Sequence, residues 1–143
     1  MSDRRSLNFN EQLYFVNSVF KHRDAIQVLV KFVSSSHLGG VAALKEGIAL
    51  VSNTHKIHSR RIRGSKLYLS KNSDIHIKVH NRDTEPAPRD PLFNEPVKDS
   101  GTLIEHHIVV TKTNLFLLVK SHHVLMDGAA YVQYLKDIFK AIR

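Results

Sequence analysis

The sequence of 143 residues contains no cysteine and no tryptophan. The absence of cysteine excludes disulfides, zinc sites built on thiolates and a thiol nucleophile. Long apolar runs are also missing: the longest, residues 115–119, is far shorter than the ~20 residues that span a membrane. The N-terminus has no apolar block of the kind that forms a signal peptide. These absences indicate a cytoplasmic protein without a membrane span.

Acidic residues are scarce, with 13 Asp and Glu against 21 Lys and Arg and a formal net charge of +8. Such a surplus favours anionic partners, among them phosphorylated cofactors and acidic proteins. The densest basic stretch, residues 60–66, alternates with turn residues and has few aromatic residues nearby. It fits either a solvated strand edge or an anion-binding strip, and nucleic acid is not the expected partner.

Hydrophobic periodicity predicts a chain in which helices and strands are mixed. Apolar residues at helical spacing predict helices over residues 10–20, 41–53 and 128–143. Runs rich in β-branched residues predict strands over residues 25–33, 57–62, 66–69, 75–80, 103–110 and 114–122. All four prolines fall in residues 81–101, which predicts a surface loop. This order predicts one α/β domain over residues 1–143, an α+β sandwich in which helices cover a mixed sheet.

The stretch Ser-His-His-Val-Leu-Met-Asp-Gly at residues 121–128 lies where the last predicted strand gives way to the C-terminal helix. Such junctions hold reactive groups rigidly and leave them reachable. Adjacent strand residues point to opposite faces, so His122 and His123 cannot both face one site. We expect His122 to be buried and His123 to face a cleft. Asp127 can cap the helix or pair with an arginine, and Gly128 permits a tight turn.

Less specific interpretations of the histidines stay open. Taken alone, the stretch at residues 121–128 also fits a buried histidine pair followed by a helix-capping Asp-Gly. A second pair, His106 and His107, lies in the middle of a predicted strand and is expected to consist of ordinary sheet residues. His55 and His58 are three positions apart without an acidic residue in the same stretch. No metal site is therefore expected.

The pattern His-His-x-x-x-Asp-Gly at residues 122–128 resembles the signature of the chloramphenicol acetyltransferase-like superfamily. That superfamily includes condensation domains of nonribosomal peptide synthetases, polyketide-associated acyltransferases and alcohol acetyltransferases. Residues 7–11, Leu-Asn-Phe-Asn-Glu, resemble the Leu-Ser-x-x-Glu start of the latter two groups. Residues 26–57 resemble the family's opening strand and the helix that follows it. Lys56 stands where the family's His-Pro-x-Leu-Arg region has proline.

The resemblance implies an acyltransferase in which His123 is the general base. Its imidazole would take the proton from an alcohol or amine that attacks an acyl thioester. Asp127 would be a structural aspartate paired with an arginine that the sequence does not identify. His122 would be a structural hydrogen-bonding residue, and Gly128 would keep the acceptor channel open. The acyl donor would be a thioester of coenzyme A or of carrier-protein phosphopantetheine, without a metal or redox cofactor.

The larger members of this family have two similar lobes, with the catalytic histidine in a tunnel between them. The resemblance implies that this chain is the N-terminal lobe without the second, so that the site is incomplete in the chain alone. Three arrangements stay open: a piece of a longer acyltransferase, a subunit that pairs with a separate second lobe, or a self-associating oligomer. The alternative function is a non-catalytic docking module of the same fold that binds an acidic carrier protein or a partner lobe.

Overall fold

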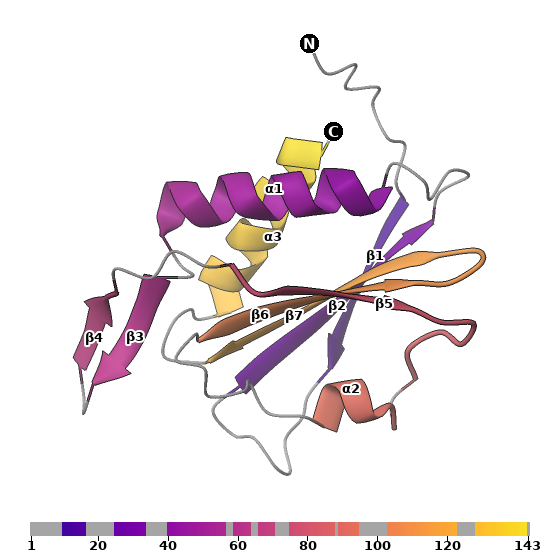
Figure 1. Ribbon diagram of the computed structural model, residues 1–143, viewed down its shortest axis with the longest axis horizontal. Coiled ribbons are helices and arrows are strands. Elements are labelled where there is room, and N and C mark those ends of the chain that lie inside the picture. Colours follow the sequence, from indigo (N-terminus) through magenta and orange to yellow (C-terminus); the bar gives the residue numbers. More distant parts are fainter. Residues whose placement is uncertain are drawn as a thin grey trace.

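A five-stranded sheet with the strand order β1-β2-β7-β6-β5 forms the centre of the protein (Figure 1). The computed structural model describes residues 10–16, 25–33, 40–56, 59–63, 66–70, 75–87, 89–94, 103–122 and 128–142. The strands of the sheet are β1 (Asn10–Val16), β2 (Ala25–Val33), β7 (Leu115–His122), β6 (Ile104–Val110) and β5 (Ile77–Asn81). Among these neighbours β5 and β6 run parallel and the other pairs run antiparallel. The sheet is therefore mixed, as predicted.

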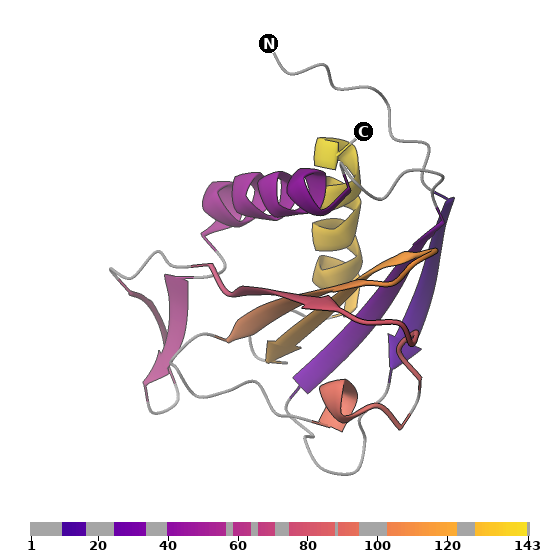
Figure 2. The ribbon, with the colours of Figure 1, turned by 45° about the vertical axis from the view of Figure 1, so that its right-hand side comes forward.

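The two faces of the sheet are covered unequally (Figures 1 and 2). Helices α1 (Gly40–His55) and α3 (Gly128–Ile142) pack on one face, which we call the helix face. The short helix α2 (Pro91–Asn94) packs on the opposite face, which we call the α2 face. A separate two-stranded sheet consists of β3 (Arg60–Arg63) and β4 (Lys66–Leu69). These layers confirm the predicted arrangement of helices over a sheet.

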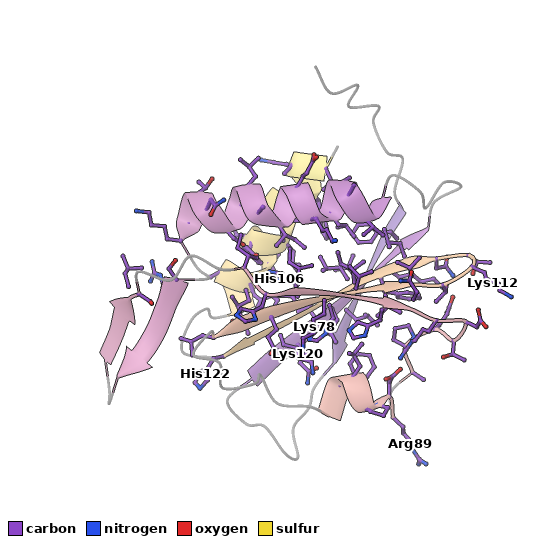
Figure 3. The ribbon with its side chains drawn as sticks, viewed as in Figure 1. Lys78, Arg89, His106, Lys112, Lys120 and His122 are labelled. Atoms are coloured by element: carbon purple, nitrogen blue, oxygen red, sulfur yellow. The ribbon has the colours of Figure 1, made fainter. Side chains whose placement is uncertain are left out.

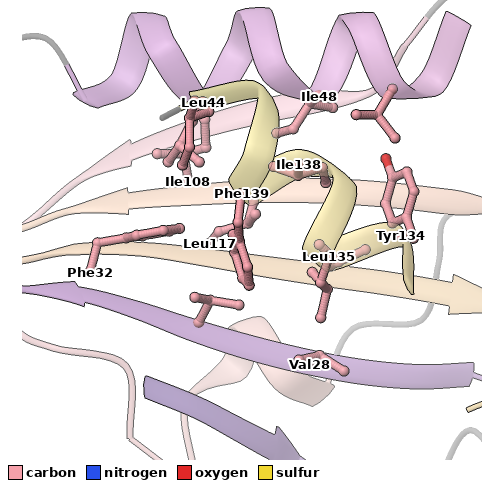
Figure 4. Packing of buried hydrophobic residues seen from close by; sticks show 14 of the residues in the cluster. Val28, Phe32, Leu44, Ile48, Ile108, Leu117, Tyr134, Leu135, Ile138 and Phe139 are labelled. Carbon is pink, nitrogen blue, oxygen red and sulfur yellow. The ribbon is translucent and has the colours of Figure 1, made fainter. Parts of the chain in front are cut away.

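Alternation along β2 and β7 builds a separate apolar cluster on each face. On the helix face, Val28 and Leu117 contact the apolar side chains of α1 and α3 (Figure 4). On the α2 face, Leu29 and Leu118 pack with α2. The buried side chains that α3 contributes to the helix-face cluster are Tyr131, Tyr134, Leu135, Ile138, Phe139 and Ile142. Because both faces of the central strands are buried, β7 is held rigidly along its length.

The helix predicted over residues 10–20 is wrong, because residues 10–16 form strand β1. The strand pairs antiparallel with β2, with Leu13 opposite Val30 and Phe15 opposite Val28. Leu13 and Val16 have helical spacing, but the aromatic and β-branched residues around them favour a strand once a partner strand is available. Residues 17–20 lie outside the described part of the chain.

The described part of the predicted surface loop over residues 81–101 contains a helical turn, α2. Asp90 begins this turn, because its Oδ1 accepts a hydrogen bond from the Leu92 amide at 3.0 Å and its other oxygen pairs with Arg82. Burial raises the pKa of Asp90, but the hydrogen bonds from Arg82 and Leu92 outweigh it and hold that pKa below its usual value. This stabilisation is present at neutral pH and is lost as the pH falls through the lowered pKa.

The remaining boundaries differ from the prediction by a few residues. The strand expected over residues 57–62 is β3 (Arg60–Arg63), and residues 57 and 58 lie outside the described part. The strand expected over residues 75–80 is β5 (Ile77–Asn81). Within the described residues, none of the helices is both long and apolar enough to cross a membrane.

Candidate active site at the junction of β7 and α3

The motif predicted to carry the chemistry falls between β7 and α3. Strand β7 ends at His122 and helix α3 begins at Gly128, so the connection consists of residues 123–127. His123 and Asp127 belong to this connection and lie outside the described residues. The two boundaries agree with the placement of the motif at a strand-to-helix junction.

Both ends of this connection are anchored to the sheet. At the end of β7, the His122 amide donates to the Leu103 carbonyl at 2.8 Å. In the first turn of α3, the fully buried Tyr131 donates its hydroxyl to the Val119 carbonyl of β7. Burial, reinforced by the neighbouring Tyr134, raises the pKa of Tyr131 well above its ordinary value, so this hydroxyl keeps its proton. The segment that carries His123 therefore starts and ends at fixed points.

His122 lies at the end of β7 on the α2 face (Figure 3). Its side chain follows Leu118 and Lys120 at alternate positions of the strand, and the strand register continues to His122 opposite Ala25. The side chain is half-buried, whereas the sequence predicted that it would be buried. The structural role of His122 stays a prediction.

The α2 face also carries a row of buried polar side chains next to His122. Lys120 of β7 lies directly opposite Gln27 of β2 on one side and directly opposite Glu105 of β6 on the other. Lys120 is 1 % exposed, Gln27 2 % and Glu105 6 %. The Gln27 amide donates to the Phe93 carbonyl at 2.8 Å, which ties α2 to this row. Sequence analysis missed the row, although its signal is visible as polar residues at alternate positions of apolar strands.

The row continues through His107 to the edge strand β5. The Nε2 of His107 lies 3.4 Å from Glu105 Oε2, and its Nδ1 lies 3.0 Å from His80 Nε2. The two rings stack with their centroids 5.3 Å apart. A carboxylate can only accept a hydrogen bond, so His107 carries a proton on Nε2, and one of the two facing nitrogens of His107 and His80 donates to the other. His107 is in the sheet as predicted, and it also links two strands through its side chain.

His106 makes a separate network on the helix face. Its Nδ1 donates to the His76 carbonyl at 3.1 Å, so its Nε2 accepts from the Tyr134 hydroxyl at 2.7 Å. The Tyr134 oxygen in turn accepts from Ser52 of α1 at 3.0 Å. Burial raises the pKa of Tyr134 despite the hydrogen bond with Ser52, so its hydroxyl keeps its proton. The network joins β6, α3 and α1.

Two further features of the described residues bear on ligand binding. Among the described residues, no group of three or more histidine and acidic side chains is arranged to hold a metal ion. A shallow groove of about 300 Å³ lies between α1 and α3, and its lining includes Leu50, His55, Asp137 and Lys140. None of the described residues that line the groove belongs to the motif.

Comparisons by sequence and comparisons by structure give different results for this chain. No protein-family model and no curated protein matches the sequence. Solved structures do match. The structure of TRI101 from F. sporotrichioides, complexed with coenzyme A and T-2, superposes with a TM-score of 0.62 at 18 % identity, over 83 % of this chain and 35 % of that chain.

Two matches come from condensation domains. The structure that describes condensation domain-mediated chain release from the enacyloxin polyketide synthase has a TM-score of 0.60 at 16 % identity, over 82 % of this chain and 25 % of that one. The starter condensation domain of the rhizomide synthetase RzmA has a TM-score of 0.59 at 14 % identity, over 80 % of this chain and 32 % of that one. The chain has the chloramphenicol acetyltransferase-like fold. This confirms the fold that the motif predicted.

The chain spans a third or less of the length of each condensation domain structure that it matches, and 35 % of the length of the TRI101 chain. At these identities the likeness concerns the fold alone.

Proposed function

We propose that this chain is the N-terminal lobe of an acyltransferase of the condensation type. It transfers an acyl group from a thioester of coenzyme A or of a carrier protein to an alcohol or an amine. The observation that carries the proposal is the His-His-x-x-x-Asp-Gly motif between two anchored elements of a chloramphenicol acetyltransferase-like fold. Coenzyme A in the matched TRI101 structure supports the choice of donor.

In the proposed reaction, His123 accepts the proton of the acceptor hydroxyl or amine. The acceptor oxygen or nitrogen forms a bond to the thioester carbonyl carbon, which becomes tetrahedral. The carbon–sulfur bond then breaks, and the thiolate leaves with the proton that His123 returns. An imidazole suits both steps because it accepts and returns a proton near neutral pH. The net charge of +8 favours the phosphates of coenzyme A or an acidic carrier protein.

A thiol-release assay tests this function. We expect the protein to release thiol from acetyl coenzyme A or an acylated carrier protein when an alcohol or amine acceptor is added, and to form the acylated acceptor in equal amount. Because the second lobe supplies part of the site in this proposal, the assay uses the complete protein, and the isolated chain is expected to be weak or inactive.

The alternative, a docking module without turnover, predicts a different result in the same assay. It would bind an acidic carrier protein or a partner lobe and release no thiol with any acceptor. Binding without acceptor-dependent thiol release by the complete protein would therefore contradict acyl transfer.

A further inference from the structure

The positive charge of the chain is concentrated in one segment. The 116 residues outside positions 47–73 carry 15 Lys and Arg against 13 Asp and Glu, so they are almost neutral. Residues 47–73 contain no Asp or Glu and six basic residues, Lys56, Arg60, Arg61, Arg63, Lys66 and Lys71. Most of the net charge of +8 therefore comes from less than a fifth of the sequence.

Strands β3 and β4 place most of their basic residues on one face of a hairpin. In the antiparallel register, Arg61 lies opposite Tyr68 and Arg63 lies opposite Lys66. Alternate residues of a strand and directly opposite residues of two strands share a face. These four positions therefore form one face, which we call the basic face, and it has three of the four basic residues of the two strands. The register favours the anion-binding strip over a solvated strand edge, because the charges are grouped.

The hairpin lies at the surface, apart from the five-stranded sheet. Strands β3 and β4 form their own sheet, which the Ser70 amide closes at its base by donating to the Ser59 carbonyl at 2.7 Å. At the same base, Arg60 is exposed and Leu69 is 59 % exposed. A surface hairpin of this kind is accessible to a partner without any change in the core.

The hairpin lies at the end of the molecule that carries the motif. Figures 1 and 2 both show it beside the end of the sheet at which β7 stops. Figure 3 shows His122, the last residue of β7, at that same end. Because the hairpin does not belong to the sheet that carries the motif, a partner that uses both has to extend over both elements. A protein with its acyl group on a flexible arm meets that requirement better than a small donor.

The size of the basic face also distinguishes between anionic partners. Each of its strands has four residues, a length of roughly 13 Å. Three positive residues are fewer than the roughly six to ten phosphate contacts of a typical DNA-binding protein. Single-stranded nucleic acid is bound by several stacked aromatic residues, and this face has Tyr68 alone. A short row of charges fits the carboxylates of an acidic protein surface better.

We propose that the basic face of the β3–β4 hairpin is the docking surface for the acidic face of a carrier protein, whose thioester arm reaches the connection between β7 and α3. The proposal rests on the proposed function and deepens it, because it assigns the donor as a protein-bound thioester instead of free coenzyme A. Residues 61, 63 and 66 supply the attraction, which brings the carrier protein to this end of the molecule and orients it. The acyl group reacts at the motif.

Calorimetric titration with the acyl carrier proteins of the source organism tests docking without turnover. We expect one of them to bind the complete protein, and to bind more weakly as salt rises from about 50 mM to about 300 mM, because salt screens exposed charges. Arg61→Glu/Arg63→Glu should raise Kd about tenfold or more, because two attractions become repulsions. The control Lys112→Glu/Lys136→Glu makes the same change of charge at two exposed lysines outside the hairpin and should have a much smaller effect.

Thiol release with two donors separates docking from chemistry. With an acetylated carrier protein, Arg61→Glu/Arg63→Glu should raise KM as it raises Kd and leave kcat unchanged. With acetyl pantetheine, which has neither a phosphate nor a protein part, the variant should behave as the wild-type protein, and this also shows that it is folded. Absence of acyl transfer from every donor would contradict the proposed function, and the titration would still decide the docking.

Several results would overturn docking at the hairpin. They are the absence of binding by any of the carrier proteins, and an equal loss of binding in the hairpin variant and the control variant. An equal loss of activity with acetyl pantetheine would mean that the hairpin supports the site or the fold instead. A loss confined to acetyl coenzyme A would assign the basic face to the phosphates of that donor. Binding of a single-stranded oligonucleotide that depends on the hairpin, without binding of a carrier protein, would assign it to nucleic acid.

Discussion

Replacing His123 with alanine is expected to lower kcat for acyl transfer about 10²- to 10⁴-fold in the complete protein. The imidazole is the proposed general base, and its removal leaves no group to take the proton from the acceptor as the carbon–oxygen or carbon–nitrogen bond forms. The anchoring of β7 and α3 does not depend on this side chain, because it is made by the Leu103 carbonyl and by Tyr131. The variant should therefore keep its melting temperature, and steady-state thiol release measures the loss.

His55→Ala is the matched control for this variant. It removes an imidazole from the C-terminal end of α1, remote in sequence from the motif, and should leave kcat unchanged.

Asp127→Ala is expected to differ from both variants, because the proposed role of Asp127 is structural. It should lower the melting temperature, and activity should be lost in proportion to the loss of folded protein. If Asp127→Ala keeps its melting temperature and loses rate as steeply as His123→Ala, the aspartate orients the base instead. If neither variant changes thiol release, the motif is a feature of the fold alone.

Replacing Lys120 with methionine is expected to lower the free energy of unfolding by about 3–5 kcal/mol, the cost expected when a buried carboxylate loses a positive charge directly opposite it in the sheet. Lys120 is 1 % exposed and lies opposite Glu105, which is 6 % exposed. Directly opposite side chains of an antiparallel pair start from Cβ atoms roughly 4.5–5.5 Å apart, so the ammonium group of Lys120 is within reach of the Glu105 carboxylate. Without the ammonium group, the carboxylate of Glu105 stays buried with less compensation.

The double variant Lys120→Met/Glu105→Gln separates charge from packing in urea denaturation. It removes both charges and should recover a large part of the loss, because no uncompensated charge remains. Lys112→Met is the control for the loss of a lysine: its side chain is 83 % exposed and lies 4.0 Å from Asp83, so about 0–1 kcal/mol is expected. A loss for Lys120→Met as small as that for Lys112→Met would contradict a buried charge row.

The central strands were predictable from sequence because most of their residues are apolar. Strands β2 and β7 are nearly continuous in apolar character, as expected for strands buried on both faces. The start of α3 at Gly128 follows from the Asp-Gly after an apolar strand, and helix α1 has regular apolar spacing. In these segments local propensity and tertiary packing favour the same structure.

Strand β1 was not predictable because its pattern is compatible with two structures. Leu13 and Val16 fit one face of a helix, and pairing with β2, which local periodicity does not reveal, makes the segment a strand. Helix α2 could have been predicted from Asp90 and Pro91, because an aspartate cap followed by proline is typical of the start of a helix. The four prolines of this segment favoured the prediction of a loop instead.

The histidine pair at 106 and 107 shows why the polar networks were missed. The sequence predicts that adjacent strand residues face opposite sides, and they do. It does not indicate that the partners are Tyr134 from α3 and His80 from β5, which the topology brings together over 28 and 27 positions of sequence. By contrast, the end of β7 and the start of α3 could be placed in advance because their sequence signals are local.

A structure of the complete protein bound to an unreactive thioether analogue of the acyl donor tests the central claim most directly. The account predicts that the analogue lies beside the connection between β7 and α3, with a nitrogen of His123 within about 3 Å of the place where the attacking oxygen or nitrogen binds. A His123 ring packed in the core with no accessible nitrogen, or an analogue bound away from this connection, would contradict acyl transfer at this site.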